Sequence, residues 1–277
     1  MLKLMYITND IDVAMVAQEN GVDRIWIDLE TKGKETRQAG MNTVKSHHCI
    51  EDIVKLRPYI NKSELLVRIN PWDENSPDEV EQVIQAGADI IMLPMWRTSK
   101  EVLEFVKRVN RRVKTMLLLE TLDAENTLDE VVKINGIDEI HIGLNDLHLE
   151  YGLTFMFELL ANGTVERICN KLATAGIPYG FGGVGRIGEG LLKADNIVVE
   201  HYRLGSSMVI LSRNFCDTSI ITDVNEIQNV FKMNIENMKS FERVVCTCYD
   251  ESDFKKNQMS VADSVREVVN KIRNEGR

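Results

Sequence analysis

Two stretches, Met116-Leu-Leu-Leu-Glu-Thr121 and Ile140-His-Ile-Gly-Leu-Asn-Asp-Leu-His-Leu149, decide how this chain folds. Each is a short apolar run, typical of a β-strand, and leads into a carboxylate: Glu120 in the first and Asp146 in the second. The spacing of the two carboxylates is about that of one strand–helix–strand unit. In a parallel barrel both would lie at neighbouring C-terminal strand ends, where such barrels build their active sites. The pair suits a hard divalent cation such as Mg²⁺, and the alternative is a helix cap and a surface acid.

Short apolar runs recur along the chain, with amphipathic stretches between them. One such stretch starts after Ser76-Pro77 and ends at Gly87, and another covers Ser99–Val109. Alternating strand and helix patterns favour parallel strands joined by crossover helices. We therefore predict an α/β fold, a (β/α)₈ TIM barrel, with an open doubly wound sheet as the alternative. The predicted strands are Leu2–Ile7, Arg24–Leu29, Leu65–Ile69, Ile90–Leu93, Thr115–Leu119, Glu139–Ile142, Tyr179–Phe181 and Tyr202–Leu204.

The pattern changes after residue 222. Residues 1–222 would form the catalytic barrel, and residues 223–277 a helical extension. Helical stripes at Val224–Arg243 and Ser260–Arg273 flank a polar stretch at Tyr249–Asn257. A complete barrel does not need these apolar stripes, and an exposed stripe usually marks an interface. We therefore predict additional C-terminal helices that pack on a neighbouring subunit of a homo-oligomer, such as a dimer, trimer or hexamer.

Composition narrows the class of protein. A chain of 277 residues that is 44% hydrophobic and 27% charged has the make-up of an ordinary globular protein. The formal net charge of −10 argues against nucleic acid as a partner. No apolar run is long enough for a membrane span, and the first residues do not have the form of a signal peptide. The scattered, odd set of five cysteines is typical of reduced thiols, so we predict a cytoplasmic protein.

Two further strand ends carry polar residues, Asp28-Leu-Glu30 and Val67-Arg68-Ile-Asn70. An arginine at the end of an apolar strand is costly to bury without a partner. Arg68 would point into the same mouth as Glu120 and Asp146, where a guanidinium can bind a carboxylate in bidentate fashion or stabilise an oxyanion. The alternative is an internal ion pair from Arg68 to Glu30 or Glu120.

These motifs follow one another in an order that resembles the HpcH/HpaI aldolase and citrate lyase β-subunit family, from about Gly21 to Leu211. The resemblance implies a barrel that makes or breaks a carbon–carbon bond next to a 2-oxo acid, such as pyruvate or oxaloacetate, or an acyl thioester. The motifs are Ile27-Asp-Leu-Glu30, Val67-Arg68-Ile-Asn70, Ala86-Gly-Ala-Asp-Ile-Ile-Met-Leu-Pro94, Leu119-Glu120-Thr121 and Ile137-Asp-Glu-Ile-His-Ile-Gly-Leu-Asn-Asp-Leu147.

The resemblance also assigns roles to residues. Glu120 and Asp146 match the ligands of Mg²⁺ or a similar ion such as Mn²⁺. Arg68 matches the arginine that binds the oxo or enolate oxygen, and we place Glu30 on the substrate side of the same mouth. Enolate chemistry suits this set, because a divalent ion and a guanidinium both stabilise developing negative charge.

The chain departs from the family at Thr31. The aldolase branch has a catalytic histidine there, and the citrate lyase branch an aspartate. The general base is therefore open: the candidates are a metal-bound water, His47, His48 and an outward-facing His141, and we carry His48 forward. A divergent or non-catalytic barrel that binds a small anionic ligand remains the alternative. A phosphodiesterase would need more histidines near the metal.

Two loops would complete the mouth. Lys34 and Arg37, in Gly33–Gln38, could clamp a distal phosphate or carboxylate. The glycine-rich Gly180–Gly190 loop contains a literal dinucleotide fingerprint, which we reject because it comes late and lacks the following acidic residue. We expect Gly183 and Arg186 in this loop to bind an anion on the substrate, with a ligand-free lid as the alternative. The segment Arg203-Leu-Gly-Ser-Ser207 would line the far side.

Overall fold

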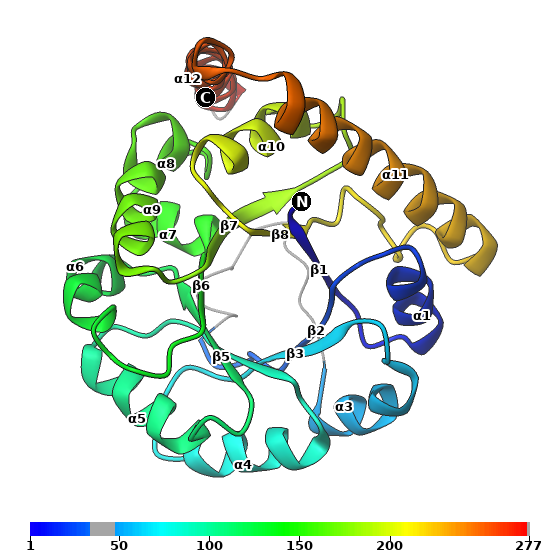
Figure 1. Ribbon diagram of the computed structural model, residues 1–277, viewed down its shortest axis with the longest axis vertical. Coiled ribbons are helices and arrows are strands. Elements are labelled where there is room, and N and C mark those ends of the chain that lie inside the picture. The colour runs from blue at the N-terminus through cyan, green and yellow to red at the C-terminus, as the bar shows by residue number, and fades with distance from the viewer. Residues whose placement is uncertain (34–47, 276–277) are drawn as a thin grey trace.

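The computed structural model describes residues 1–33 and 48–275, and these form a closed barrel of parallel strands (Figure 1). The strands pair in chain order, and the first pairs with the last, so the predicted (β/α)₈ TIM barrel is confirmed. The strands are β1 (Lys3–Ile7), β2 (Arg24–Asp28), β3 (Glu64–Arg68), β4 (Ile90–Leu93), β5 (Lys114–Leu119), β6 (Glu139–Ile142), β7 (Tyr179–Val184) and β8 (Met208–Leu211).

Helices surround the barrel (Figure 1). Local signals set their ends: α5, for example, begins at the capping box of Thr98 and Glu101 and ends at Asn110, in the left-handed conformation. The helices are α1 (Ile11–Glu19), α3 (Ile50–Leu56), α4 (Ser76–Ala86), α5 (Ser99–Val109), α6 (Leu122–Val131), α7 (Leu144–Glu150), α8 (Glu158–Ala161), α9 (Thr164–Ala175), α10 (Ala194–Arg203), α11 (Val224–Cys248) and α12 (Glu251–Glu275), with a 3₁₀ turn at Arg57–Tyr59.

The predicted eighth strand is wrong. Tyr202–Leu204 lies at the end of α10, and the strand that closes the barrel is Met208–Leu211. The predicted segment is three residues long, too short for periodicity to distinguish the end of a helix from a strand. The segment 203–207 therefore enters β8 from its N-terminal end, where the Lys3 amide donates to the Ser207 carbonyl. It lies opposite the mouth and does not line it.

Strand β2 shows how the barrel interior is layered. Ile25 and Ile27 pack outward against the helices, while Arg24, Trp26 and Asp28 alternate with them and face inward. Arg24 is fully buried near the N-terminal end of the barrel, where it pairs with Glu139 of β6 at 2.6 Å. Trp26 lies in the middle layer, packed with methionine and leucine side chains. Asp28 is left at the C-terminal end, where the candidate site lies.

His141 does not face outward as predicted. It is fully buried, and its Nε2–H donates to the Gly182 carbonyl at 3.0 Å. Because Glu139, two residues earlier on β6, reaches Arg24 inside the barrel, His141 faces the interior as well. Burial lowers the pKa of His141 to about 4. This histidine is therefore neutral near pH 7 and part of the packed interior.

The C-terminal helices are longer than predicted and pack on the barrel of their own chain. The polar stretch Tyr249–Asn257 is mostly helical, because the Asp250 carboxylate accepts the amides of Ser252 and Asp253 at the start of α12. α11 lies against α1 and α10, and α12 against α8 and α10 (Figure 1). The apolar stripes are thus largely covered within the chain, and their contact with a neighbouring subunit stays a prediction. The homo-oligomer and the division at residue 222 stay predictions.

The first strand is anchored to α11. The buried Glu242 carboxylate accepts the Leu2 amide at 2.7 Å and the Tyr202 hydroxyl at 2.8 Å. One side chain thus joins the entry to β1, helix α10 and helix α11. Within the described ranges, no helix combines the length and apolar character needed to cross a bilayer.

Candidate functional site

Arg68 is the central cation of the barrel mouth. It ends β3 and lies directly opposite Asp28 of β2 in the sheet register. Its Nε and Nη2 donate to the two Asp28 carboxylate oxygens, each at 2.8 Å, and Nη2 also lies 3.3 Å from a Glu30 oxygen. Burial alone would lower the pKa of Arg68, but Asp28 and Glu30 outweigh it and raise that pKa. The guanidinium is therefore charged and fixed, and Nη1 is the nitrogen that these bonds leave unused.

The floor beneath Arg68 is aromatic. The guanidinium carbon lies 5.1 Å from the centroid of the Trp26 ring, within the range of a cation–π contact. Trp26 is itself 2% exposed and packed into the interior layer of the barrel. The plane below and the carboxylates beside it therefore restrict how Arg68 can move.

Glu120 and Asp146 lie at the same mouth, on neighbouring parts of the barrel. Glu120 directly follows β5, and Asp146 lies in the first turn of α7, one helical turn beyond β6 rather than at the strand end itself. Both side chains are buried, and Glu120 Oε1 accepts the Met95 amide at 3.1 Å. Burial raises the pKa of Glu120 well above its usual value, and the charges of Asp146 and Glu30 raise it further, against the opposing effect of Arg68. The predicted residues thus form one electrostatic cluster.

The donor set suits a hard divalent cation. Asp28, Glu30 and Glu120 interact with the Arg68 guanidinium, and Asp146 interacts with Glu120, so several carboxylates gather at this mouth. In residues 1–33 and 48–275, no three acidic, histidine or cysteine side chains form a ready-made metal cage. A cation here would therefore use two carboxylates and oxygens from water or substrate. Mg²⁺ is bound in this way at many phosphate and oxo-acid sites.

Thr31 lacks the titratable side chain that a histidine or aspartate would provide at this position, and its polar groups are bonded to Asn70. Its amide and hydroxyl both donate to Asn70 Oδ1, at 3.0 and 3.3 Å, and the Asn70 amide group donates to Glu79 at 2.8 Å. The Thr31 side chain is exposed and cannot serve as a titratable base. It instead ties the end of β2 to the end of β3.

His48 comes close to the same strand from another part of the chain. Its Nδ1 accepts the backbone amide of Asp28 at 3.0 Å. The Thr8 amide donates to the Trp26 carbonyl one step earlier, so the imidazole continues the hydrogen-bond ladder on the β1 side of β2. His48 is thus placed beside the residue that clamps Arg68. The other expected loop residues, Lys34, Arg37 and His47, lie outside the described residues.

The glycine-rich segment contributes through β7 and the turn after it. Gly183 belongs to β7 and pairs with Ile210 of β8. Arg186 follows the strand, half-buried, and its Nε donates to the Phe215 carbonyl at 3.0 Å. That bond directs part of the guanidinium to the segment after β8 and joins the two neighbouring strand ends.

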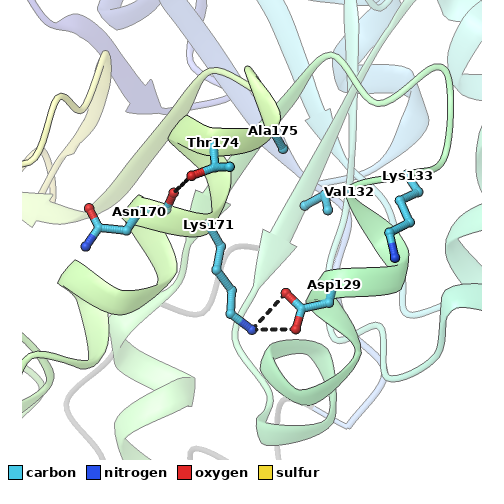
Figure 2. A pocket seen from close by; sticks show the side chains of 7 residues that line it. All are labelled: Asp129, Val132, Lys133, Asn170, Lys171, Thr174 and Ala175. Atoms are coloured by element: carbon cyan, nitrogen blue, oxygen red, sulfur yellow. Dashed lines mark hydrogen bonds and ion pairs between the residues drawn. The ribbon is translucent and has the colours of Figure 1, made fainter.

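A separate depression lies on the outside of the barrel, between α6 and α9 (Figure 2). Lys171 and Asp129 form an ion pair across it. Its lining comes from the C-terminal parts of both helices, which lie toward the N-terminal ends of the strands. This surface contains none of the mouth residues and is not the candidate site.

The order of these elements and the residues at their ends match a known family. The HpcH/HpaI aldolase/citrate lyase model matches residues 4–177. The chain belongs to the HpcH/HpaI aldolase/citrate lyase family. Its matched region contains Glu30, Arg68, Glu120 and Asp146, so the residues that meet at the mouth come from the part of the chain that defines membership.

Solved structures of this family share the fold. An HpcH/HpaI aldolase/citrate lyase family protein from Burkholderia cenocepacia J2315 has 15% identity and a TM-score of 0.62, over 82% of this chain and 94% of its own. An HpcH/HpaI aldolase from Desulfitobacterium hafniense DCB-2 has 16% identity and a TM-score of 0.58, over 86% and 93%. The citrate synthase SbnG has 14% identity and a TM-score of 0.58, over 86% and 92%. No curated protein matches significantly in sequence.

Three supports of this candidate site were not predicted from the sequence: the Asp28 pair with Arg68, the Trp26 ring beneath it and the Met95 amide that holds Glu120. Alternation along β2 was the signal for Trp26 and Asp28, since residues two apart share a face. Nothing in the sequence marks the Met95 amide, because any residue type carries one.

The raised pKa of Glu120 leads to a stability prediction. Glu120→Gln keeps an acceptor for the Met95 amide but removes a charge that the fold penalises. In the unfolded chain the Glu120 carboxyl ionises at its ordinary pKa, so above about pH 4 its raised pKa in the native state lowers the stability of the wild type. The variant should therefore be more stable by at least about 1 kcal/mol at pH 8. As the pH falls toward the ordinary glutamate range, Glu120 is neutral in both states, and the difference should shrink toward zero.

Melting of the metal-free proteins from pH 5 to 8, in the presence of a chelator, measures this difference. Glu81→Gln on α4 is the control, because that carboxylate is partly exposed and pairs with Arg112. A variant less stable than wild type at pH 8 would contradict the electrostatic account of Glu120.

Proposed function

We propose that this protein is a divalent-metal-dependent carbon–carbon lyase or aldolase, acting through an enolate on a small 2-oxo acid of the pyruvate or oxaloacetate kind, or on an acyl thioester. The observation that carries the proposal is the meeting of a fixed guanidinium, Arg68, with the carboxylates Glu120 and Asp146 in one buried mouth. Cleavage next to a carbonyl leaves an enolate, and a preorganised positive environment stabilises it.

Glu120 and Asp146 are the residues that would hold Mg²⁺ or Mn²⁺. Bound there, the ion supplies Lewis-acid stabilisation of the enolate oxygen. The raised pKa of Glu120 supports this assignment, because a carboxylate that is costly to ionise alone gains most from a nearby cation. Asp146 lies on α7 and Glu120 follows β5, so the ion would be held by carboxylates from two different elements.

Arg68 binds the oxo oxygen of the substrate in this proposal. Two of its nitrogens are committed to Asp28, which fixes the plane of the guanidinium before substrate arrives. Nη1 then presents a donor that needs no reorientation, and preorganised donors are the ones that lower a barrier. Glu30, in contact with the same guanidinium, lies on the substrate side and helps set its orientation.

The proton transfer is assigned to His48. Its Nδ1 lone pair accepts the Asp28 amide, so a proton taken up at Nδ1 would break that bond. Protonation of His48 is thereby coupled to the strand end that clamps Arg68. At the far side of the mouth, Gly183 and Arg186 are assigned to the distal anionic group of the substrate. The homo-oligomer and the cytoplasmic location remain predictions alongside this function.

Exchange of the methyl protons of pyruvate tests the enolate step directly. In D₂O with Mg²⁺ or Mn²⁺, the protein should replace these protons with deuterium, which proton NMR follows as a loss of the methyl signal. Asp146→Asn should weaken Mn²⁺ binding by calorimetry and reduce exchange by about 100-fold. Omission of the metal should abolish exchange above background.

Two results would contradict the proposal in different ways. Metal binding and pyruvate binding without exchange would make the protein a non-catalytic barrel for a small anion. Exchange that is indifferent to a chelator and to Asp146→Asn would overturn the metal assignment.

Replacement of Arg68 by lysine tests whether the planar guanidinium, with its several donors, is needed. A lysine ammonium cannot hold both Asp28 oxygens and present a third donor in plane, so Arg68→Lys should lower kcat/KM for exchange by about 100-fold while the fold is kept. Arg112→Lys is the matched control, because Arg112 pairs with Glu81 on the exterior. Near-normal turnover in Arg68→Lys would show that a point charge suffices.

His48→Asn separates proton transfer from hydrogen bonding. The asparagine Oδ1 can accept the Asp28 amide in place of Nδ1, but it cannot titrate. We expect unchanged melting and a loss of exchange rate of 100-fold or more, about what a general base contributes. A variant with wild-type exchange would limit His48 to the support of β2, and His48→Ala should then lower the melting temperature.

A further inference from the structure

Met95 adopts a backbone conformation that its side chain disfavours. It follows β4 with φ +53°, and in the described part of the chain only two other non-glycine residues, Asn110 and Arg111, have positive φ. Those two form the turn after α5, at a helix C-terminus where this conformation is common. Met95 has no such helix-end context, since it lies between a strand and a loop. A conformation of this kind persists where the surroundings require it.

The conformation aims the Met95 amide at the site. Its N–H donates to Glu120 Oε1 at 3.1 Å, from a residue that is 9% exposed. The next residue reinforces the connection, because the Trp96 carbonyl accepts the Thr121 hydroxyl at 2.9 Å. The turn after β4 is thus joined to the turn after β5 by one bond to Glu120 and one bond just beyond it.

Gly143 restricts Glu120 from the other side. A Cβ at this position would lie 2.9 Å from Glu120 Cβ, 2.9 Å from Glu120 Oε2 and 3.2 Å from Leu118 Cδ1. Gly143 has φ −82°, so its backbone does not require glycine. The lack of a side chain is what the position needs, because the Glu120 carboxylate occupies that space.

We infer that Met95 and Gly143 are positioning residues for Glu120, which orient its carboxylate so that Oε1 is held by an amide and Oε2 faces the start of α7. This inference rests on the proposed function, because it concerns how Glu120 is presented to a divalent ion. Oε2 lies beside Gly143, the residue that precedes α7, and α7 carries Asp146 in its first turn. Oε2 is therefore the oxygen assigned to a cation that the two residues share.

Met95→Gly tests the strained side of this arrangement. Glycine adopts positive φ freely, so the variant keeps the amide but removes what confines its direction. We expect a melting temperature equal to wild type or about 2 °C higher, with Mn²⁺ binding weakened about tenfold, as is usual when the support of a metal ligand is loosened. Arg111→Gly is the matched control, because it relieves a similar φ of +57° in the turn after α5 and should leave Mn²⁺ affinity unchanged.

Gly143→Ala tests the crowded side. The added methyl must displace the Glu120 carboxylate, so Mn²⁺ affinity, measured by calorimetry or by electron paramagnetic resonance, should fall tenfold or more. In a Glu120→Ala background the Met95 amide has no carboxylate to hold, and Met95→Gly should then change the residual affinity by less than about twofold. In the pyruvate exchange reaction, the weaker metal binding of Gly143→Ala should appear mainly as a higher metal concentration for half-maximal rate.

The outcomes separate this inference from the proposed function. If Glu120→Ala greatly weakens Mn²⁺ binding while both Met95→Gly and Gly143→Ala bind as wild type, the proposed function stands and the positioning role is wrong. If Glu120→Ala itself binds Mn²⁺ normally, both are overturned. Should Gly143→Ala fail to fold, the Met95→Gly and Arg111→Gly pair decides.

Discussion

The mouth of this barrel depends on one buried cation, the guanidinium of Arg68. Asp28 and Glu30 contact it directly, and its charge also acts on Glu120. Burying a single ion pair rarely stabilises a protein, because desolvation offsets the attraction. Here the pair is one part of a larger cluster of acids, and without Arg68 those acids would repel one another in a low-dielectric space. The guanidinium therefore reduces the repulsion among the carboxylates gathered at the mouth.

It could be predicted that Arg68, Glu120 and Asp146 lie close together, because the ends of the strands can be recognised in the sequence. Each apolar run stops at a polar residue, and the ends of parallel strands meet on one side. Which side chains pair there could not be predicted, because pairing depends on register. Asp28 lies opposite Arg68 only because β2 and β3 align with no offset at that level. Glu30 and Glu120 were the partners expected for Arg68; Glu30 is a secondary contact, and the bidentate partner is Asp28.

The errors in the fold have a similar physical cause. The predicted eighth strand, Tyr202–Leu204, is the end of helix α10, because so short a segment does not distinguish a helix end from a strand. The apolar stripes of α11 and α12 were read correctly as buried faces, but periodicity does not say what covers them. In this chain the cover is α1, α8 and α10. The position of His48 against β2 could not be predicted either, because His48 and Asp28 are 20 residues apart in the sequence and their contact leaves no local signal.

The closure of the barrel sets an order on how the chain can fold during synthesis. β1 leaves the ribosome before the other strands of the barrel, yet one of its two edges pairs with β8, and the Leu2 amide that leads into it is held by Glu242 of α11. That edge must wait unpaired while some 200 residues are translated, an interval of roughly 10–40 s at ordinary elongation rates. An unpaired strand edge is a template for association with other chains. The nascent barrel is therefore exposed to aggregation until β8 emerges, and a chaperone that shields β1 during that interval would protect it.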